Sequence, residues 1–285
     1  FTATALASAI GTLLIAFMAK LPFAQAPGMG INAFFAFTLC LTMGYSWQQS
    51  LAAVFIEGLI FIVLTAFNVR EQIVNCIPKS LRFAISAGIG FFIAFVGLKN
   101  SGIIVANDAT LVSLGHFNAT SSLACLGIIL SAVLMKLRVR GALFYSIIVC
   151  TLIGIPLGVT KIGADFTPIS MPHDIAPTFL QMDFSKVLSG DMILTILVLV
   201  FIDIFNTIGT LIGAAAKTEM MDEKGNVKNI KQAMMADAIA TSTGALLGTS
   251  TVTTFVESAA GVAEGGRTGL TAFTTAMFFL VALFM

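Results

Sequence analysis

Long apolar runs, separated by short polar segments, recur from one end of this sequence to the other. A helix of roughly 20 mostly apolar residues is long enough to cross a membrane. Ten stretches approach or exceed that length, at 2–19, 21–43, 48–68, 82–98, 121–136, 141–159, 189–213, 229–248, 250–265 and 269–285. The pattern predicts an all-α polytopic membrane protein with ten spans. Residues 70–81 are interpreted as an interfacial connector and residues 160–188 as an extended loop.

The shortage of charge supports this fold class. Only 10% of the residues are charged, against roughly 25% in an ordinary soluble domain, and the mean hydropathy is +1.00. A soluble enzyme, a disordered chain and a disulfide-rich secreted module are therefore excluded. The net charge of +1 leaves no basic surplus for nucleic acid. Four scattered cysteines and two distant histidines predict neither a metal site nor a cofactor.

Lysine and arginine are distributed unevenly over the connections between the runs. Twelve of the fifteen follow odd-numbered runs, and the other three, Lys99, Lys161 and Lys186, follow even-numbered runs. Cytoplasmic connections of membrane proteins carry the excess of these residues. We therefore expect Phe1 near the outer face of a plasma or inner membrane, and the connection after residue 213 in the cytoplasm.

Two of the ten runs contain a segment that disfavours a regular helix. The second opens with Pro27 and two nearby glycines, so its helix is expected to begin near Asn32, as an N-cap. The ninth opens with the Thr-rich stretch 249–254, which favours extended backbone, so its helix is expected to begin near Glu257. Paired interrupted spans of opposite direction are typical of inverted-repeat transporters. The alternative is that each segment merely kinks a packed helix.

Four carboxyl groups lie inside apolar runs, where an ionisable residue is costly and usually functional. Asp203, Asn206 and Thr210 share one helical face, because they are three and four residues apart. With Asn32 and Glu257 they offer acceptors, amide donors and a hydroxyl to a flat heterocycle. Asp203 or Glu257 could also carry a proton with that ligand.

The remaining polar and aromatic candidates have plainer interpretations. For Glu57 and Asp237 we favour a carboxyl that locks helices together through hydrogen bonds. Phe255 could stack on an aromatic ligand, but ordinary packing is the simpler role in a chain with 25 phenylalanines. Gly244 and Gly248 are interpreted as positions where helices pack closely.

Three segments resemble a known family: APGMGINAFFAF at 26–37, FIDIFNTIGTLIG at 201–213 and GTSTVTTFVESAAGVAEGGRTGL at 248–270. The chain resembles the nucleobase permeases of the xanthine–uracil permease superfamily, in particular the AzgA-like guanine–hypoxanthine–adenine permeases. The resemblance extends over the whole chain. It implies an inverted-repeat (7+7) fold of fourteen spans with two half-strand, half-helix spans, in which the ten runs are the second to the eleventh.

The resemblance also implies domains. Residues 1–69 would belong to the core domain of the first repeat and 70–160 to its gate domain. Residues 161–188 would form an extracytoplasmic loop, and 189–285 the core domain of the second repeat.

Activity and site residues are implied in the same way. The family takes up purine nucleobases by proton symport, contacts membrane lipid and often forms homodimers. The implied substrate contacts are Asn32, Asp203, Asn206 and Glu257, more weakly Thr210 and Phe255, and the backbone at Gly28, Met29, Gly30 and Val256. The family usually has aspartate where this chain has Asn206. An amide cannot release a proton, so Asp203 and Glu257 remain the candidate proton carriers.

Other functions explain the sequence less well. The main alternative is a transporter of the same fold with another cargo, such as uracil or xanthine. An anion carrier is disfavoured because no Lys or Arg lies within a run core. A membrane protease built on Asp203 and Asp237 lacks a GxGD motif, a channel lacks a filter repeat, and an ATP-driven pump lacks a GxxxxGK[ST] loop. We therefore predict a secondary transporter and not an enzyme.

Overall fold

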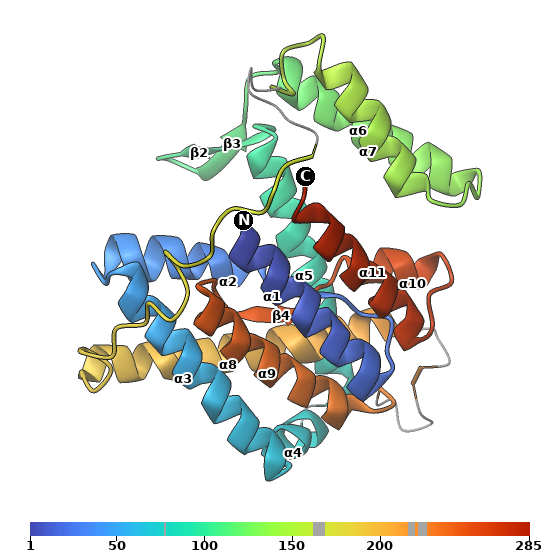
Figure 1. Ribbon diagram of the computed structural model, residues 1–285. Helices are drawn as coiled ribbons and strands as arrows, with labels where there is room; N and C mark the ends of the chain where they lie inside the picture. The colour runs from blue at the N-terminus through green and yellow to red at the C-terminus, as the bar shows by residue number, and fades with distance from the viewer. Residues whose placement is uncertain (77, 162–168, 216–219, 222–226) are drawn as a thin grey trace. The chain divides into compact units, whose positions relative to one another are not determined.

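The computed structural model describes residues 1–76, 78–161, 169–215, 220–221 and 227–285. Helices dominate this part of the chain, accompanied by short antiparallel strands (Figure 1). The chain divides into a larger unit, Phe1–Ser86 with Ile169–Met285, and a smaller unit, Ala87–Pro168. The larger unit contains every residue predicted to contact a substrate.

The N-terminal part of the larger unit contains the first interrupted run. α1 (Thr2–Leu14) continues into the π-helical segment η1 (Ile15–Ala19). β1 (Gln25–Pro27) follows, and α2 (Met29–Ala33) continues as π-helical η2 (Phe34–Thr42). α3 (Trp47–Ala66) begins with a capping box, and α4 (Val69–Cys76) occupies most of the predicted connector.

The C-terminal part contains the second interrupted run. α8 (Gly190–Ala215) and α9 (Ile230–Leu247) precede β4 (Val252–Thr254). The short helix α10 (Ser258–Ala263) and then α11 (Gly269–Ala282) complete the unit. A helix therefore follows a strand in both parts.

Gly244 and Gly248 do not form the predicted helix–helix contact. Gly248 is the C-cap of α9, with a φ of +96° that favours glycine. A Cβ on Gly244 would lie 2.6 Å from Cγ2 of Val252 in β4, and a Cβ on Gly248 would lie 2.5 Å from Cβ of Thr178. Gly244 thus leaves room for β4, and Gly248 leaves room for the loop at Thr178, because α9 ends between the two glycines and the chain turns back.

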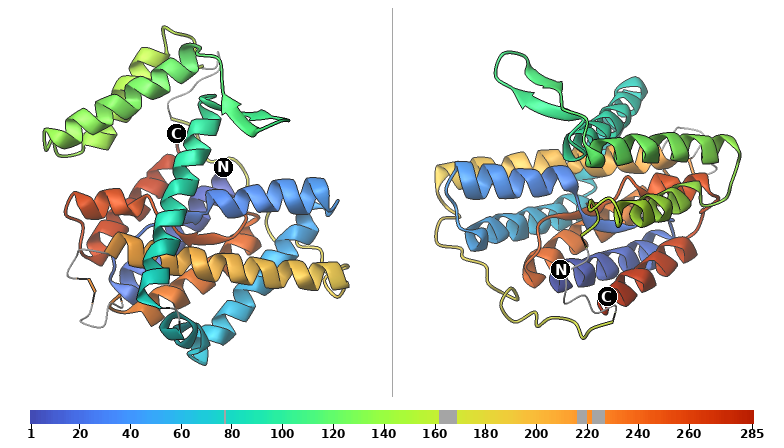
Figure 2. Two further views of the ribbon diagram at one scale, coloured as in Figure 1. Left: turned by 180° about the vertical axis from the view of Figure 1, so that it is seen from behind. Right: turned by 90° about the horizontal axis from the view of Figure 1, so that it is seen from above.

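The larger unit is packed around α9. This helix contacts α1 and α3, and α1 also lies beside α11 (Figure 2). A Cβ on Gly58 of α3 would lie 2.3 Å from Ser242 Oγ and 2.8 Å from Ser242 N of α9. Only glycine permits this approach of two helix backbones. Large apolar side chains fill the space around it, among them Phe23, Phe61, Leu199, Ile208 and Met234.

The smaller unit consists of a hairpin and helices. α5 (Lys79–Asn100) enters it from the larger unit. The hairpin of β2 (Ile104–Asn107) and β3 (Leu111–Leu114) follows, in a segment with no predicted strand. α6 (Ala119–Lys136) packs on α7 (Ala142–Gly154), and Ser131 Oγ donates to Ser146 Oγ at 2.8 Å.

Each of the ten predicted runs contains a described helix. By length and composition, four of the described helices could cross a membrane: Thr2–Ala19, Trp47–Ala66, Ala119–Lys136 and Gly190–Ala215. Shorter apolar helices are Met29–Thr42, Ala87–Asn100, Ala142–Gly154 and Gly269–Ala282. The span count and the division into core and gate domains stay predictions. Lys217 and Lys224, which entered the topology argument, lie outside the described residues, as do residues 162–168 of the predicted loop.

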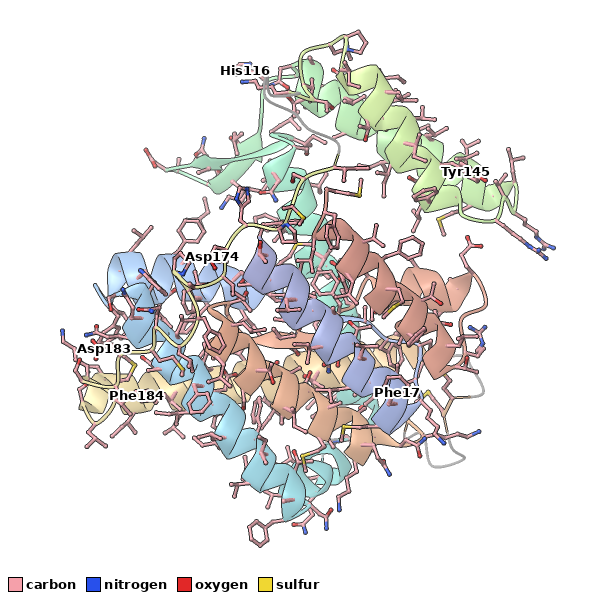
Figure 3. All side chains as sticks on the ribbon, in the orientation of Figure 1. Phe17, His116, Tyr145, Asp174, Asp183 and Phe184 are labelled. Atoms are coloured by element: carbon pink, nitrogen blue, oxygen red, sulfur yellow. The ribbon has the colours of Figure 1, made fainter. Side chains whose placement is uncertain are left out.

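The described residues of that loop, 160–161 and 169–188, form no regular helix or strand. It docks on α3 (Figure 3): Gln49 Nε2 donates to Asp183 Oδ2 at 3.2 Å, and the Phe184 ring meets the Phe55 ring edge-on with centroids 6.2 Å apart. The amide and then the hydroxyl of Ser185 donate to the Asp183 carboxylate and hold its pKa below the usual value.

Candidate functional site

Two short strands from distant parts of the chain pair inside the larger unit. β1 and β4 are antiparallel, with Gln25 opposite Thr254, Ala26 opposite Thr253 and Pro27 opposite Val252. Beyond the strands, Phe255 N donates to Ala24 O at 2.9 Å. Irregular backbone at membrane depth must be satisfied within the protein. The two segments that interrupt the second and ninth runs thus satisfy backbone groups of one another.

Helix α2 begins earlier than predicted. Gly28, with extended backbone (φ −65°, ψ 130°), is its N-cap and Met29 its first residue. The prediction that Asn32 caps the helix is therefore wrong, since Asn32 N already bonds Gly28 O at 2.8 Å. The reason is tertiary: a Cβ at Gly28 would lie 3.0 Å from Thr253 Cγ2, so β4 packs tightly against this turn. The Asn32 Oδ1 instead accepts a hydrogen bond from Ser250 Oγ.

Helix α10 begins where predicted. Glu257 is its N-cap and Ser258 its first residue. Ser258 Oγ accepts a hydrogen bond of 2.9 Å from Ala24 N, which ties the start of α10 to the residue before β1. Glu257 is exposed, and Phe255 and Val256 are half-buried. These three predicted residues thus lie on the surface of the larger unit and outside its packed interior.

The start of α2, in the first interrupted run, also has exposed residues, as the start of α10 does. Met29 and Asn32 are exposed, Gly30 is half-buried, and Gly28 is buried beneath them. Predicted contacts from both interrupted runs are therefore accessible in the larger unit.

α8 carries the third group of predicted residues and packs against β4 and α10. Asp203 and Thr210 are buried, and Asn206 is half-buried. Asn206 Nδ2 lies 3.5 Å from Thr253 Oγ1, and a Cβ on Gly28 would lie 3.9 Å from the same nitrogen. Asn206 therefore sits at the junction of β1 and α2.

Sequence reasoning missed the hydroxyl groups that surround Asp237. Asp237 is fully buried; Thr207 Oγ1 donates to its Oδ2 at 3.0 Å, and Thr253 Oγ1 donates to its Oδ1 at 3.2 Å. The two threonine hydroxyls lie 2.9 Å from one another. Asp237 thus connects α8, α9 and β4, as its interpretation as a locking carboxyl predicted. One signal for Thr207 was present, because it follows Asp203 by one helical turn.

The predicted residues comprise carboxylates, amides and a hydroxyl. Asp203 and Glu257 supply acceptors, Asn32 and Asn206 supply both donors and acceptors, and Thr210 supplies a hydroxyl. Within the described residues, no group of three or more His, Cys, Asp or Glu side chains could hold a metal ion. This set is chemically suited to an uncharged ligand that carries both N–H donors and acceptor atoms.

Known proteins resemble the chain over its whole length. The model of a family described as a permease family, Xan_ur_permease, matches residues 1–285. The chain is 43% identical over 287 residues to the guanine/hypoxanthine permease PbuG of Bacillus subtilis, and 41% identical over 287 residues to the adenine permease AdeP of Escherichia coli. Both alignments cover 100% of this chain and 64% of the relative, so the chain spans about two thirds of the length of these relatives.

Solved structures share the fold. The transmembrane domain of the cyanobacterial bicarbonate transporter BicA is similar with a TM-score of 0.61 and 16% identity, over 99% of this chain and 77% of that one. SLC26A9 is similar with a TM-score of 0.55 and 13% identity, over 99% of this chain and 49% of that one. At this identity the likeness concerns the fold and not the cargo.

Proposed function

The chain belongs to the xanthine/uracil permease family, and from this premise we propose that the protein imports purine nucleobases together with a proton. It is an integral membrane permease and not an enzyme. The cargo is hypoxanthine, guanine, adenine or more than one of them. The observation that carries this proposal is the identity of 43% and 41%, over the whole chain, to permeases of guanine, hypoxanthine and adenine.

The chemistry of the site supports a purine as cargo. A purine edge presents N–H donors beside ring-nitrogen or carbonyl acceptors. The carboxylates of Glu257 and Asp203 accept from the N–H groups, and the amides of Asn32 and Asn206 bond to either kind of atom. Thr210 adds a hydroxyl, Phe255 stacks on the base, and the backbone at Gly28, Met29, Gly30 and Val256 borders it.

The two carboxyl groups also account for coupling to protons. A carboxylate is expensive inside a membrane unless it is paired or neutralised. A proton on Glu257 or Asp203 removes that charge while the base is carried. Glu257 is the better placed of the two, because it is exposed on the larger unit while Asp203 is buried.

Transport follows the alternating-access scheme of inverted-repeat carriers. Residues 1–69 and 189–285 act as the core domain and hold the base between the two interrupted spans. This domain moves past a gate domain that includes residues 70–160, and the site opens to one face of the membrane at a time. A homodimer would hold the gate domains still while the core domains move.

The decisive experiment is uptake of radiolabelled hypoxanthine by cells that lack their own purine carriers and express the full-length protein. Uptake is measured with and without a protonophore, for the wild type and for Glu257→Gln. We expect saturable uptake that the protonophore abolishes and that the variant loses by at least about 100-fold, since Gln cannot exchange a proton. Parallel uptake of labelled adenine, guanine, uracil and xanthine identifies the cargo.

Glu264→Gln is the matched control. Glu264 is an exposed carboxyl at the other end of α10, and we expect uptake within about twofold of the wild type. If the protein is in the membrane but none of the five bases enters, the nucleobase proposal is wrong. Uptake of uracil or xanthine alone would correct the cargo and keep the transport mechanism.

A further inference from the structure

We propose that Glu57, a carboxyl of α3 outside the substrate contacts named above, is a positioning residue for the site. It fixes the segment Ser250–Thr251, and through this segment the Asn32 side chain and the Gly28 amide. The inference rests on the proposed function, because the groups that Glu57 positions are proposed substrate contacts.

A chain of hydrogen bonds leads from Glu57 to the first broken span. Thr251 Oγ1 donates to Glu57 Oε2 at 2.9 Å, and both residues are fully buried. The carbonyl of Thr251 accepts from Gly28 N at 3.4 Å. The preceding residue, Ser250, donates its hydroxyl to Asn32 Oδ1. Thr251 is thus held on one side by α3 and holds the start of α2 on the other.

Close packing keeps Glu57 in place. Its neighbour Gly58 lies against the backbone of Ser242, where a Cβ would be 2.8 Å from the Ser242 nitrogen. Farther along α9, Gly244 admits the side chain of Val252, the residue after Thr251. α3, α9 and the start of β4 are therefore fixed relative to one another. The hydrogen bond that Glu57 accepts from Thr251 then determines where Thr251 lies.

The consequence at the site is an oriented amide. Ser250 gives its hydroxyl proton to Asn32 Oδ1, so Asn32 presents Nδ2 as a donor. One N–H of this nitrogen is directed to Pro27 O at 3.5 Å, and the other remains for a ligand. A ligand that meets Asn32 must then supply an acceptor atom, as a purine ring nitrogen or carbonyl does. A displaced Thr251 would move Ser250, free the amide to rotate and weaken binding without removing a substrate contact.

The test compares Thr251→Val with Thr251→Ser in the hypoxanthine uptake assay. Valine has nearly the same shape but no hydroxyl, so we expect KM to rise about tenfold while the maximal rate stays within about threefold. Serine keeps the hydroxyl, and Glu57→Gln keeps an acceptor oxygen, so both variants should stay within about threefold of the wild-type KM. Ser250→Ala, which breaks the bond to Asn32 directly, should raise KM as Thr251→Val does, and it tests the proposal even if Thr251→Val fails to fold.

Thr243→Val is the matched control, because the Thr243 hydroxyl donates within α9, to Ile239 O at 2.7 Å. Its KM should equal that of the wild type. A second test introduces Thr251→Val into the Asn32→Ala variant. The KM of the double variant should equal that of Asn32→Ala alone. Equal KM values for Thr251→Val, Ser250→Ala and Thr243→Val, or a full additional rise in the Asn32→Ala background, would overturn the proposal. Absence of wild-type uptake would instead contradict the proposed function.

Discussion

The backbone amide of Thr254, in β4, donates a hydrogen bond of 3.0 Å to the carboxylate Oδ1 of Asp237, in α9. A helix side chain thus satisfies an amide of a strand that has only one partner strand. Thr253 and Thr254 hydroxyls donate to the same oxygen, at 3.2 and 3.3 Å. Because no water is available in a bilayer core to replace such an acceptor, Asp237 is central to the stability of the interrupted span.

Asp237→Ala should lower the free energy of unfolding by about 3 kcal/mol or more, since it leaves several buried donors without an acceptor. Asp237→Asn should cost less, because one oxygen remains. Thermal unfolding of the full-length protein in detergent measures both. Asp108→Ala, in the exposed turn of the β2–β3 hairpin, is the control and should change stability by under about 0.5 kcal/mol. A similar effect of Asp237→Ala and Asp108→Ala would contradict this role.

Gly58→Ala should destabilise the protein by about 2 kcal/mol. This loss is expected although the helix propensity of alanine is more favourable than that of glycine by roughly 1 kcal/mol. The added Cβ would meet Ser242 Oγ at 2.3 Å and force α3 from α9. Ser242→Gly in the same chain should restore part of the stability, because it removes the nearest atom but leaves the backbone. The unfolding temperatures of the wild type, Gly58→Ala and the double variant test this prediction. No rescue by Ser242→Gly would mean that this contact is not the cause.

Asn206→Asp, which replaces an amide by a carboxylate, should change cargo preference. The Asn206 amide can donate to the carbonyl of hypoxanthine or guanine, whereas an ionised aspartate repels it. Loss of one such bond corresponds to about tenfold in affinity. We expect uptake of hypoxanthine relative to adenine to fall by about that factor when both labels are measured in the same cells. An unchanged ratio would place Asn206 outside the contact with the base.

The docking of the loop on α3 should resist mild acid. The lowered pKa of Asp183 means that its contacts are fully present above its ordinary value of 3.8 and disappear only as the pH falls through the lower folded value. Amide exchange at Ser185 should therefore not change between pH 7 and pH 5 beyond its intrinsic dependence on pH. Asp183→Asn, a mimic of the protonated form, should speed this exchange at pH 7 by roughly threefold. Equal protection in the variant would show that the carboxylate does not hold the loop.

Local chemistry made part of this structure predictable. Pro27 and the threonines at 249–254 restrict the conformation of their own backbone, so the sequence indicated where the helices are interrupted. The start of α10 after Glu257 was also predicted correctly. The start of α2 was not, because the fit of Gly28 against Thr253 depends on a residue far away in the chain. The β2–β3 hairpin and the π-helical segments η1 and η2 left no periodic signal. Thr207 follows Asp203 by one helical turn, but its bond to Asp237, like that of Thr253, becomes visible only when three elements are packed.

The pairing of β1 with β4 also sets an order of events during biosynthesis. Gln25 leaves the ribosome about 230 residues before its partner Thr254. At roughly 5–20 residues per second, this delay amounts to about 10–50 seconds. During that time residues 25–27 lack their partner strand, although the N–H and C=O groups of Gln25 can already bond to Thr12 Oγ1. The first interrupted segment therefore completes its strand pairing only after residues 252–254 have been made.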